Sequence, residues 1–180
     1  MTSQSKVYVQ ILKSGEKQIH LYWMTGGDVE DQFLKASSGD LLVGRISDET
    51  RRKISKELDV VFSSEKSEIF DFDNFWNKVR NLKSGRYSLT STCSVLLTGL
   101  GIIEDLMRTF KLSRILDAQK NDKLSQFYEK LFLGSNIPAV TPIGKSYHPI
   151  WKTEEIKAFR ESMRLAWREI KRQAPRIGLS

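Results

Sequence analysis

Residues 153–174 read TEEIKAFRESMRLAWREIKRQA and predict a long C-terminal helix. Thr153 is a suitable N-cap, and Glu154 and Glu155 place negative charge at the positive end of the helix dipole. At about 100° per residue, the apolar side chains of this segment fall on one stripe. The stripe consists of Ile156, Phe159, Met163, Ala166, Trp167 and Ile170. We expect this apolar wall to pack on the body of the protein.

A stripe of basic side chains adjoins the apolar wall. Lysine and arginine on one helix face are typical of a surface that binds phosphate groups. The predicted nucleic-acid or anion-binding residues are Lys157, Arg160, Arg164, Arg168, Lys171 and Arg172. The alternative is a basic face that only contacts water.

The net charge of +7 is distributed unevenly along the chain. Residues 151–180 contain eight Lys/Arg and four Asp/Glu, whereas the first 150 residues contain 21 and 18. The excess positive charge therefore lies mostly in the terminal segment, which favours a local site over a uniformly basic surface. The partners that this charge predicts are a nucleic acid, a nucleoprotein or an anionic membrane surface.

Two aromatic residues precede the terminal helix and lie next to lysines. Tyr147 lies two residues after Lys145, and Trp151 lies immediately before Lys152. Both aromatic residues are therefore candidates for stacking on nucleic-acid bases. The alternative is that both rings anchor the preceding loop to the core.

The chain upstream of the terminal helix shows strand patterns first and helix patterns later. Lys6–Leu12 and Gln18–Met24 alternate apolar and polar residues around Gly15, which predicts a hairpin. We expect further strands at 41–46, 59–62, 69–72 and 86–98, and helices at 29–35, 47–58, 74–82, 102–111, 114–118 and 122–133. The strongest predicted strand is 86–98, RYSLTSTCSVLLT, because apolar residues there alternate with hydroxyl residues. This order predicts an α+β fold, with N-terminal antiparallel strands, interleaved helices and a helical C-terminal third.

Three segments follow from this pattern. We expect an α+β core domain over residues 1–133, an ordered connecting loop over 134–152, and a basic amphipathic helix over 153–180 packed on the core. The N-terminus lacks the layout of a signal peptide, and no apolar run approaches the about 20 residues that span a bilayer. The expected location is intracellular, either soluble or peripheral to a membrane.

A single cysteine, Cys93, excludes an intramolecular disulfide and a cysteine-based zinc site. The two histidines, His20 and His148, have no partner at metal-ligand spacing, so we expect neither a metal nor a cofactor. The segment YSLTSTCS around Cys93 resembles the nucleophile segment of permuted papain-like amidases and peptidases. That resemblance implies a catalytic pair of Cys93 and His20, although Thr92 stands where asparagine often precedes the cysteine. The alternative is a small buried thiol in a strand.

In size, charge and layout the chain resembles the small basic matrix proteins of negative-strand RNA viruses, particularly those of plant rhabdoviruses. The resemblance covers the whole chain in these general respects and transfers no residue role. It implies RNA binding or nucleocapsid condensation, membrane association and self-association, in the virion and the host cytoplasm.

We therefore expect a non-enzymatic, basic structural or binding protein without a small-molecule substrate. Its partner would be a ribonucleoprotein, a nucleic acid or an anionic membrane surface, and it could form a homo-oligomer. One alternative is a bacterial or phage effector with cysteine-hydrolase chemistry. Another is a protein-binding adaptor or immunity module whose terminal helix docks on an acidic partner.

Overall fold

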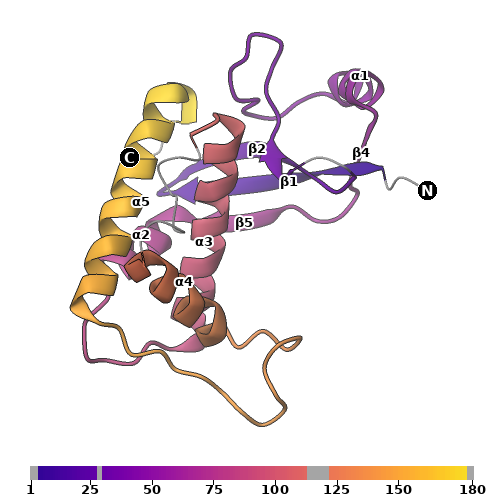
Figure 1. Cartoon of the computed structure of the whole chain (residues 1–180). Coiled ribbons are helices and arrows are strands. Elements are labelled where there is room, and N and C mark those ends of the chain that lie inside the picture. The colour runs from indigo at the N-terminus through magenta and orange to yellow at the C-terminus, as the bar shows by residue number, and fades with distance from the viewer. Residues whose placement is uncertain (1–3, 28–29, 113–121, 178–180) are drawn as a thin grey trace. The chain divides into compact units, whose positions relative to one another are not determined.

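Strands occupy the N-terminal part of the chain and helices the C-terminal part, which confirms the predicted α+β class (Figure 1). The computed structural model describes residues 4–27, 30–112 and 122–177. Two compact units are present and are described separately. Unit 1 comprises residues 1–72, 105–111 and 170–180, and unit 2 comprises 73–104 and 112–169. Neither predicted segment boundary, at 133/134 or at 152/153, coincides with a boundary between these units.

Unit 1 is built on the predicted hairpin. Strands β1 (Ser5–Ser14) and β2 (Lys17–Thr25) pair antiparallel, and Gly15 in the turn has a φ of 56°. β3 (Gln32–Phe33) pairs antiparallel with β2. β4 (Val60–Phe62) and β5 (Glu68–Asp71) both pair parallel with β1, near its start and its end respectively. Both short strands were predicted from sequence, but their parallel pairing was not.

Helix α1 (Asp48–Leu58) belongs to unit 1 and begins as predicted. The Ser47 hydroxyl caps it by accepting a hydrogen bond from the Thr50 amide at 3.2 Å. Ile54 of this helix packs against a cluster of buried side chains that includes Val7, Tyr22 and Val60. One face of the hairpin is therefore covered by apolar side chains of α1 and of the strands beside it.

Two elements predicted for unit 1 are wrong. The helix expected at 29–35 is replaced by β3, because the apolar pair at its centre, Phe33 and Leu34, is buried in extended backbone beside β2. The strand expected at 41–46 forms only isolated bridges at Leu41 and Val43. The helix predicted at 114–118 lies outside the described residues.

Four helices supply most of unit 2: α2 (Phe72–Asn81), α3 (Thr90–Thr109), α4 (Asp122–Gly134) and α5 (Thr153–Gln173). Its core contains three stacked rings. Phe127 of α4 lies 4.2 Å from Trp151 on one side and 4.2 Å from Phe159 of α5 on the other, centroid to centroid. Every residue of the predicted apolar wall of α5 is buried, which confirms that prediction.

The predicted strand at 86–98 is wrong, because residues from Thr90 onward form the first half of α3. Its buried side chains recur every three or four residues, at Cys93, Leu96, Leu100 and Ile103. The Ser94 hydroxyl donates a hydrogen bond to the Thr90 carbonyl one turn earlier, at 3.0 Å, so its polar group is satisfied within the helix. Gly99 lies inside this helix rather than ending a strand, and a Cβ at this position would overlap the Phe75 ring.

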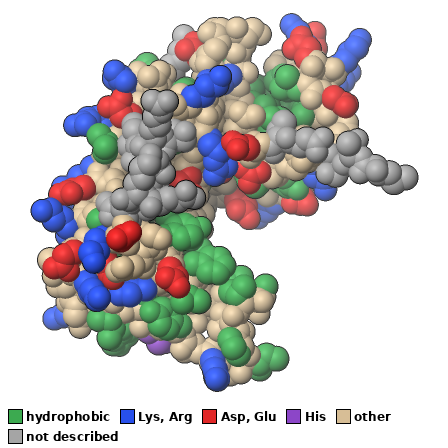
Figure 2. All heavy atoms as spheres, viewed as in Figure 1, with side chains coloured by type: hydrophobic (Ala, Val, Ile, Leu, Met, Phe, Trp, Pro, Cys, Tyr) green, Lys and Arg blue, Asp and Glu red, His purple; other side chains and the backbone are tan. Residues whose placement is uncertain are grey.

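The segment between α4 and α5 forms a loop that is closed at its base. The Asn136 side chain accepts a hydrogen bond from the Tyr147 amide at 2.7 Å and donates one to the Tyr147 carbonyl at 3.0 Å. At its tip, Ile143 is fully exposed in a turn closed by the Lys145 amide and the Pro142 carbonyl, 3.0 Å apart. Figure 2 shows hydrophobic side chains on the surface where α4 and this loop lie in Figure 1. Among the described residues, no helix is both long and apolar enough to cross a membrane.

Candidate anion-binding groove

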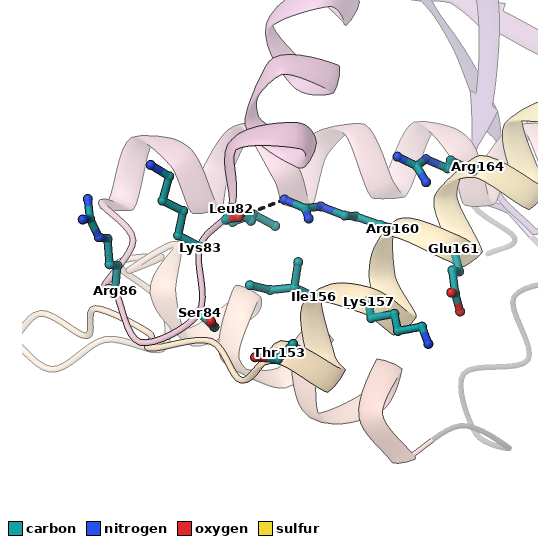
Figure 3. Close-up of a pocket in the computed structure, with 10 residues that line it drawn as sticks. All are labelled: Leu82, Lys83, Ser84, Arg86, Thr153, Ile156, Lys157, Arg160, Glu161 and Arg164. Atoms are coloured by element: carbon teal, nitrogen blue, oxygen red, sulfur yellow. Dashed lines mark hydrogen bonds between the residues drawn. The ribbon is translucent and has the colours of Figure 1, made fainter.

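The basic wall of α5 forms one side of an open groove of about 550 Å³ in unit 2. The other side is the segment that links α2 to α3. Figure 3 shows Lys83 and Arg86 extending from this linker, and Lys157 and Arg164 extending from α5. Among the described residues that line this basic groove, the five cations are Lys83, Arg86, Lys157, Arg160 and Arg164. The one carboxylate among them is Glu161, so the groove has a strongly positive lining.

Arg160 has a structural role in this groove. Its Nε donates to the Val79 carbonyl at 3.0 Å. Its Nη2 donates to the Arg80 carbonyl at 2.7 Å and to the Leu82 carbonyl at 2.8 Å. Figure 3 draws the bond to Leu82 as a dashed line. These carbonyls lie at the C-terminal end of α2, where backbone acceptors have no partner within the helix and a cation is favourable. Arg160 therefore fixes the linker against α5, in the position that brings Lys83 and Arg86 into the groove.

The six anion-binding residues predicted from sequence do not all line the same groove in the structure. Lys157, Arg160 and Arg164 line the basic groove. Arg168 is exposed and lies 3.8 Å from Glu169, while Lys171 and Arg172 are exposed in the part of α5 that belongs to unit 1. The groove therefore contains three of the predicted cations and two from the linker.

Sequence reasoning missed the linker cations, although a local signal exists. Residues 78–86 read KVRNLKSGR and contain four basic residues and no acidic one. The signal was hidden because the last residue of this run, Arg86, was assigned to a strand. Helix periodicity on α5 also says nothing about a partner segment about 70 residues earlier in the chain.

A second groove continues from the first along the linker and the start of α3. It shares Leu82, Lys83 and Arg86 with the basic groove and adds Lys78, Tyr87 and Leu89 among others. We call it the aromatic groove, because Tyr87 is 67% exposed in its wall. The Tyr87 ring lies 6.1 Å from the His148 ring, with an angle of 55° between their planes.

The aromatic residues that the sequence suggested for stacking have other surroundings. Trp151 is buried, stacks on Phe127, and donates from Nε1 to the Ser88 hydroxyl at 2.7 Å. It is therefore an anchor of the loop, as the alternative interpretation held. Tyr147 is 39% exposed, and its backbone closes the base of the loop with Asn136.

A buried ion pair fixes the start of α5 beside the basic groove. Glu155 is fully buried, and the Lys130 ammonium lies 2.9 Å from both of its carboxylate oxygens. The Lys152 amide donates to the same carboxylate at 2.8 Å. This carboxylate therefore caps the helix and joins α4 to α5, which limits movement of the wall that carries Lys157.

Cys93 lacks the properties of a catalytic thiol. Its side chain is fully buried in the first turn of α3, and burial raises the pKa of the thiol to about 11. His20 belongs to unit 1 and Cys93 to unit 2. Burial, and after it the nearby Arg45, lowers the pKa of His20. Within the described ranges, no group of three or more His, Cys, Asp or Glu side chains could hold a metal ion.

Comparison with known protein families, with curated proteins and with solved structures found no match for this chain. The function is therefore argued from the groove itself.

Proposed function

We propose that this protein binds the phosphodiester backbone of a nucleic acid in the basic groove. The observation that carries the proposal is that cations from two distant segments line one open groove. Lys83 and Arg86 line the groove from the linker, and Lys157 and Arg164 line it from α5. A strand with a phosphate at each nucleotide can contact both rows at once.

The shape of the site favours a polymer strand over a membrane. A bilayer presents a broad surface, whereas these cations surround a groove with Leu82 and Ile156 in its lining. Arginine contributes planar donors that match phosphate oxygens in pairs, and lysine contributes point charge. A matrix-type role, suggested by size, charge and layout, would place this groove against a nucleocapsid in the virion.

Binding of this kind has a characteristic salt dependence. If about four phosphates are neutralised, the logarithm of affinity falls with the logarithm of salt with a slope of about −2.8 for a single strand. Affinity should then fall roughly 50-fold between about 50 and 200 mM salt.

The test compares two sets of three substitutions by fluorescence anisotropy with a labelled RNA oligonucleotide. The groove variant combines Lys83→Ser, Arg86→Ser and Arg164→Ser, and it retains Arg160 because that side chain supports the linker. The control variant combines Arg52→Ser, Lys53→Ser and Lys56→Ser on α1, which removes the same charge elsewhere. We expect a loss of affinity of about 50-fold for the groove variant and less than about threefold for the control.

Equal losses in the two variants would mean that only net charge matters and would refute the proposed site. Vesicles that contain anionic lipid provide a second arm. Vesicle binding that fails in the groove variant, together with RNA binding that does not, would assign the groove to a membrane surface instead.

A further inference from the structure

We propose that the nucleic acid is single-stranded and that its path continues from the basic groove into the aromatic groove, where a base stacks on Tyr87. This inference rests on the proposed function, because it uses the same phosphate contacts. It adds a chemical class of ligand, an unpaired strand, and a residue that would distinguish it from other polyanions.

Continuity of the two grooves is the first step. Lys83 and Arg86 line both, so a backbone held by them in the basic groove is already at the entrance of the aromatic groove. Lys78, on α2, supplies a further cation in the aromatic groove. Positive charge therefore follows the path past Tyr87, as a binding site for an extended strand requires.

The exposed ring is the second step. Tyr87 is 67% exposed and Leu89 is 57% exposed, although both belong to a wall of the same groove. An exposed aromatic ring beside cations is an arrangement that single-strand binding sites share. If the ligand contacted the protein through its phosphates alone, these two side chains would remain exposed to water. A base stacked on the Tyr87 ring would reduce that exposure.

The backbone around Tyr87 is fixed, which is the third step. Tyr87 forms an antiparallel bridge with Ile150, and the adjacent Ser88 amide donates to the Pro149 carbonyl at 3.0 Å. The ring is thus presented from ordered backbone, so stacking a base on it orders only a few side-chain torsions. A duplex keeps its base faces stacked internally, so it cannot offer one to this ring.

The experiment uses three ligands of similar length: a single-stranded RNA, the corresponding duplex RNA and inorganic polyphosphate. Loss of one base stack corresponds to a loss of affinity of about tenfold. We expect Tyr87→Ala to weaken single-stranded RNA by about this factor and to leave polyphosphate within about twofold. Tyr87→Trp should retain binding, because indole offers a larger stacking face. Tyr128→Ala on α4 is the matched control, since Tyr128 is also an exposed tyrosine at 41%.

The outcomes separate this inference from the proposed function. If single-stranded RNA and polyphosphate both depend on the groove variant but neither responds to Tyr87→Ala, the stacking site is refuted and the groove stands. If Tyr87→Ala weakens both ligands equally, with an unchanged thermal melt, the ring acts on the groove's shape and the inference fails. A wild-type preference for duplex RNA would also refute it. Loss of sensitivity to the groove variant itself would refute the proposed function instead.

Discussion

Helices α1 and α5 are both basic and amphipathic, yet only α5 forms part of a groove lined by cations from two segments. On α1, four cations are interspersed with Asp48, Glu49 and Glu57, and Lys53 lies 3.9 Å from Glu57. Arg51 lies over the Phe62 ring at 5.9 Å. Three cations of α5 line the basic groove together with two from the linker between α2 and α3.

The difference shows that two helices of similar local charge can have different surroundings in the fold. Arg51, Arg52 and Lys56 of α1 also line an open groove, but its described lining from β4 adds no cation. In the basic groove, the linker opposite α5 adds Lys83 and Arg86 to the cations of the helix. In unit 2 that linker is fixed by Arg160, so one arginine supports the site that its neighbours form.

The largest expected effect separates two arginines on the same wall of α5. Arg160→Ala should lower the free energy of unfolding by about 3 kcal/mol, because three hydrogen bonds from a charged group to α2 carbonyls are lost. Arg164→Ala should cost less than about 0.5 kcal/mol, since that side chain is exposed. Urea denaturation monitored by tryptophan fluorescence measures both. Similar values for the two variants would contradict the structural role of Arg160.

A pH effect on stability is expected in unit 1, to which α1 belongs. Burial raises the pKa of Asp105 to about 6, against the opposing charge of Arg108. The folded state then keeps a proton that the unfolded state loses near its usual pKa of 3.8, so this contribution to stability is present below about pH 4 and lost as pH rises to 6. The expected change is about 1 to 2 kcal/mol.

Asp105→Asn should flatten that part of the curve of unfolding free energy against pH, and Glu129→Gln on the surface of α4 is the control. If the Asp105→Asn variant gave the same curve as the wild type, the pKa of the Asp105 carboxyl would not be raised in the folded state.

Charge reversal on each helix gives the next effect in size. Lys157→Glu places a carboxylate in the basic groove and should weaken RNA binding about tenfold, by repulsion from phosphate. Lys56→Glu on α1 makes the same change of charge and should weaken binding less than about twofold. Anisotropy titrations at a single salt concentration are sufficient. The comparison of the two helices fails if Lys56→Glu is the more damaging substitution.

The smallest expected effect is on the slope of the salt dependence. Arg86→Gln should reduce the slope of log affinity against log salt by about 0.7, which corresponds to one phosphate contact on a single strand. Arg52→Gln on α1 should leave the slope unchanged. Titrations at five salt concentrations give both slopes, and an equal change in the two would place α1 in the interface.

Much of the fold could be predicted from local pattern. The hairpin has strand-forming segments on both sides of Gly15, α1 has a capping serine, and the apolar stripe of α5 has a clear 3.6-residue period. The start of α3 could not be predicted in this way, because hydroxyl and β-branched residues there favour a strand and only packing decides for a helix. The parallel pairing of β4 and β5 with β1 depends on contacts distant in sequence.

The candidate site was predictable only on the α5 side. Helix periodicity placed Lys157 and Arg164 on one wall, and the structure places both in the groove. The same periodicity could not show that Arg160, on that wall, would be engaged by carbonyls of α2. Nor could it show that Tyr87, within the segment predicted as a strand at 86–98, would be 67% exposed.

The contact between Gly99 and Phe75 has a consequence for how this sequence can vary. Because the ring lies where a Cβ would be, any side chain at 99 requires a smaller one at 75. The two positions should therefore change together or not at all among functional variants of this chain. A library randomised at both should recover Gly with an aromatic residue, or Ala with a smaller aliphatic one, and rarely a mixture. These two positions are 24 residues apart in the sequence. Coupled substitutions at them would therefore report the packing of α2 on α3.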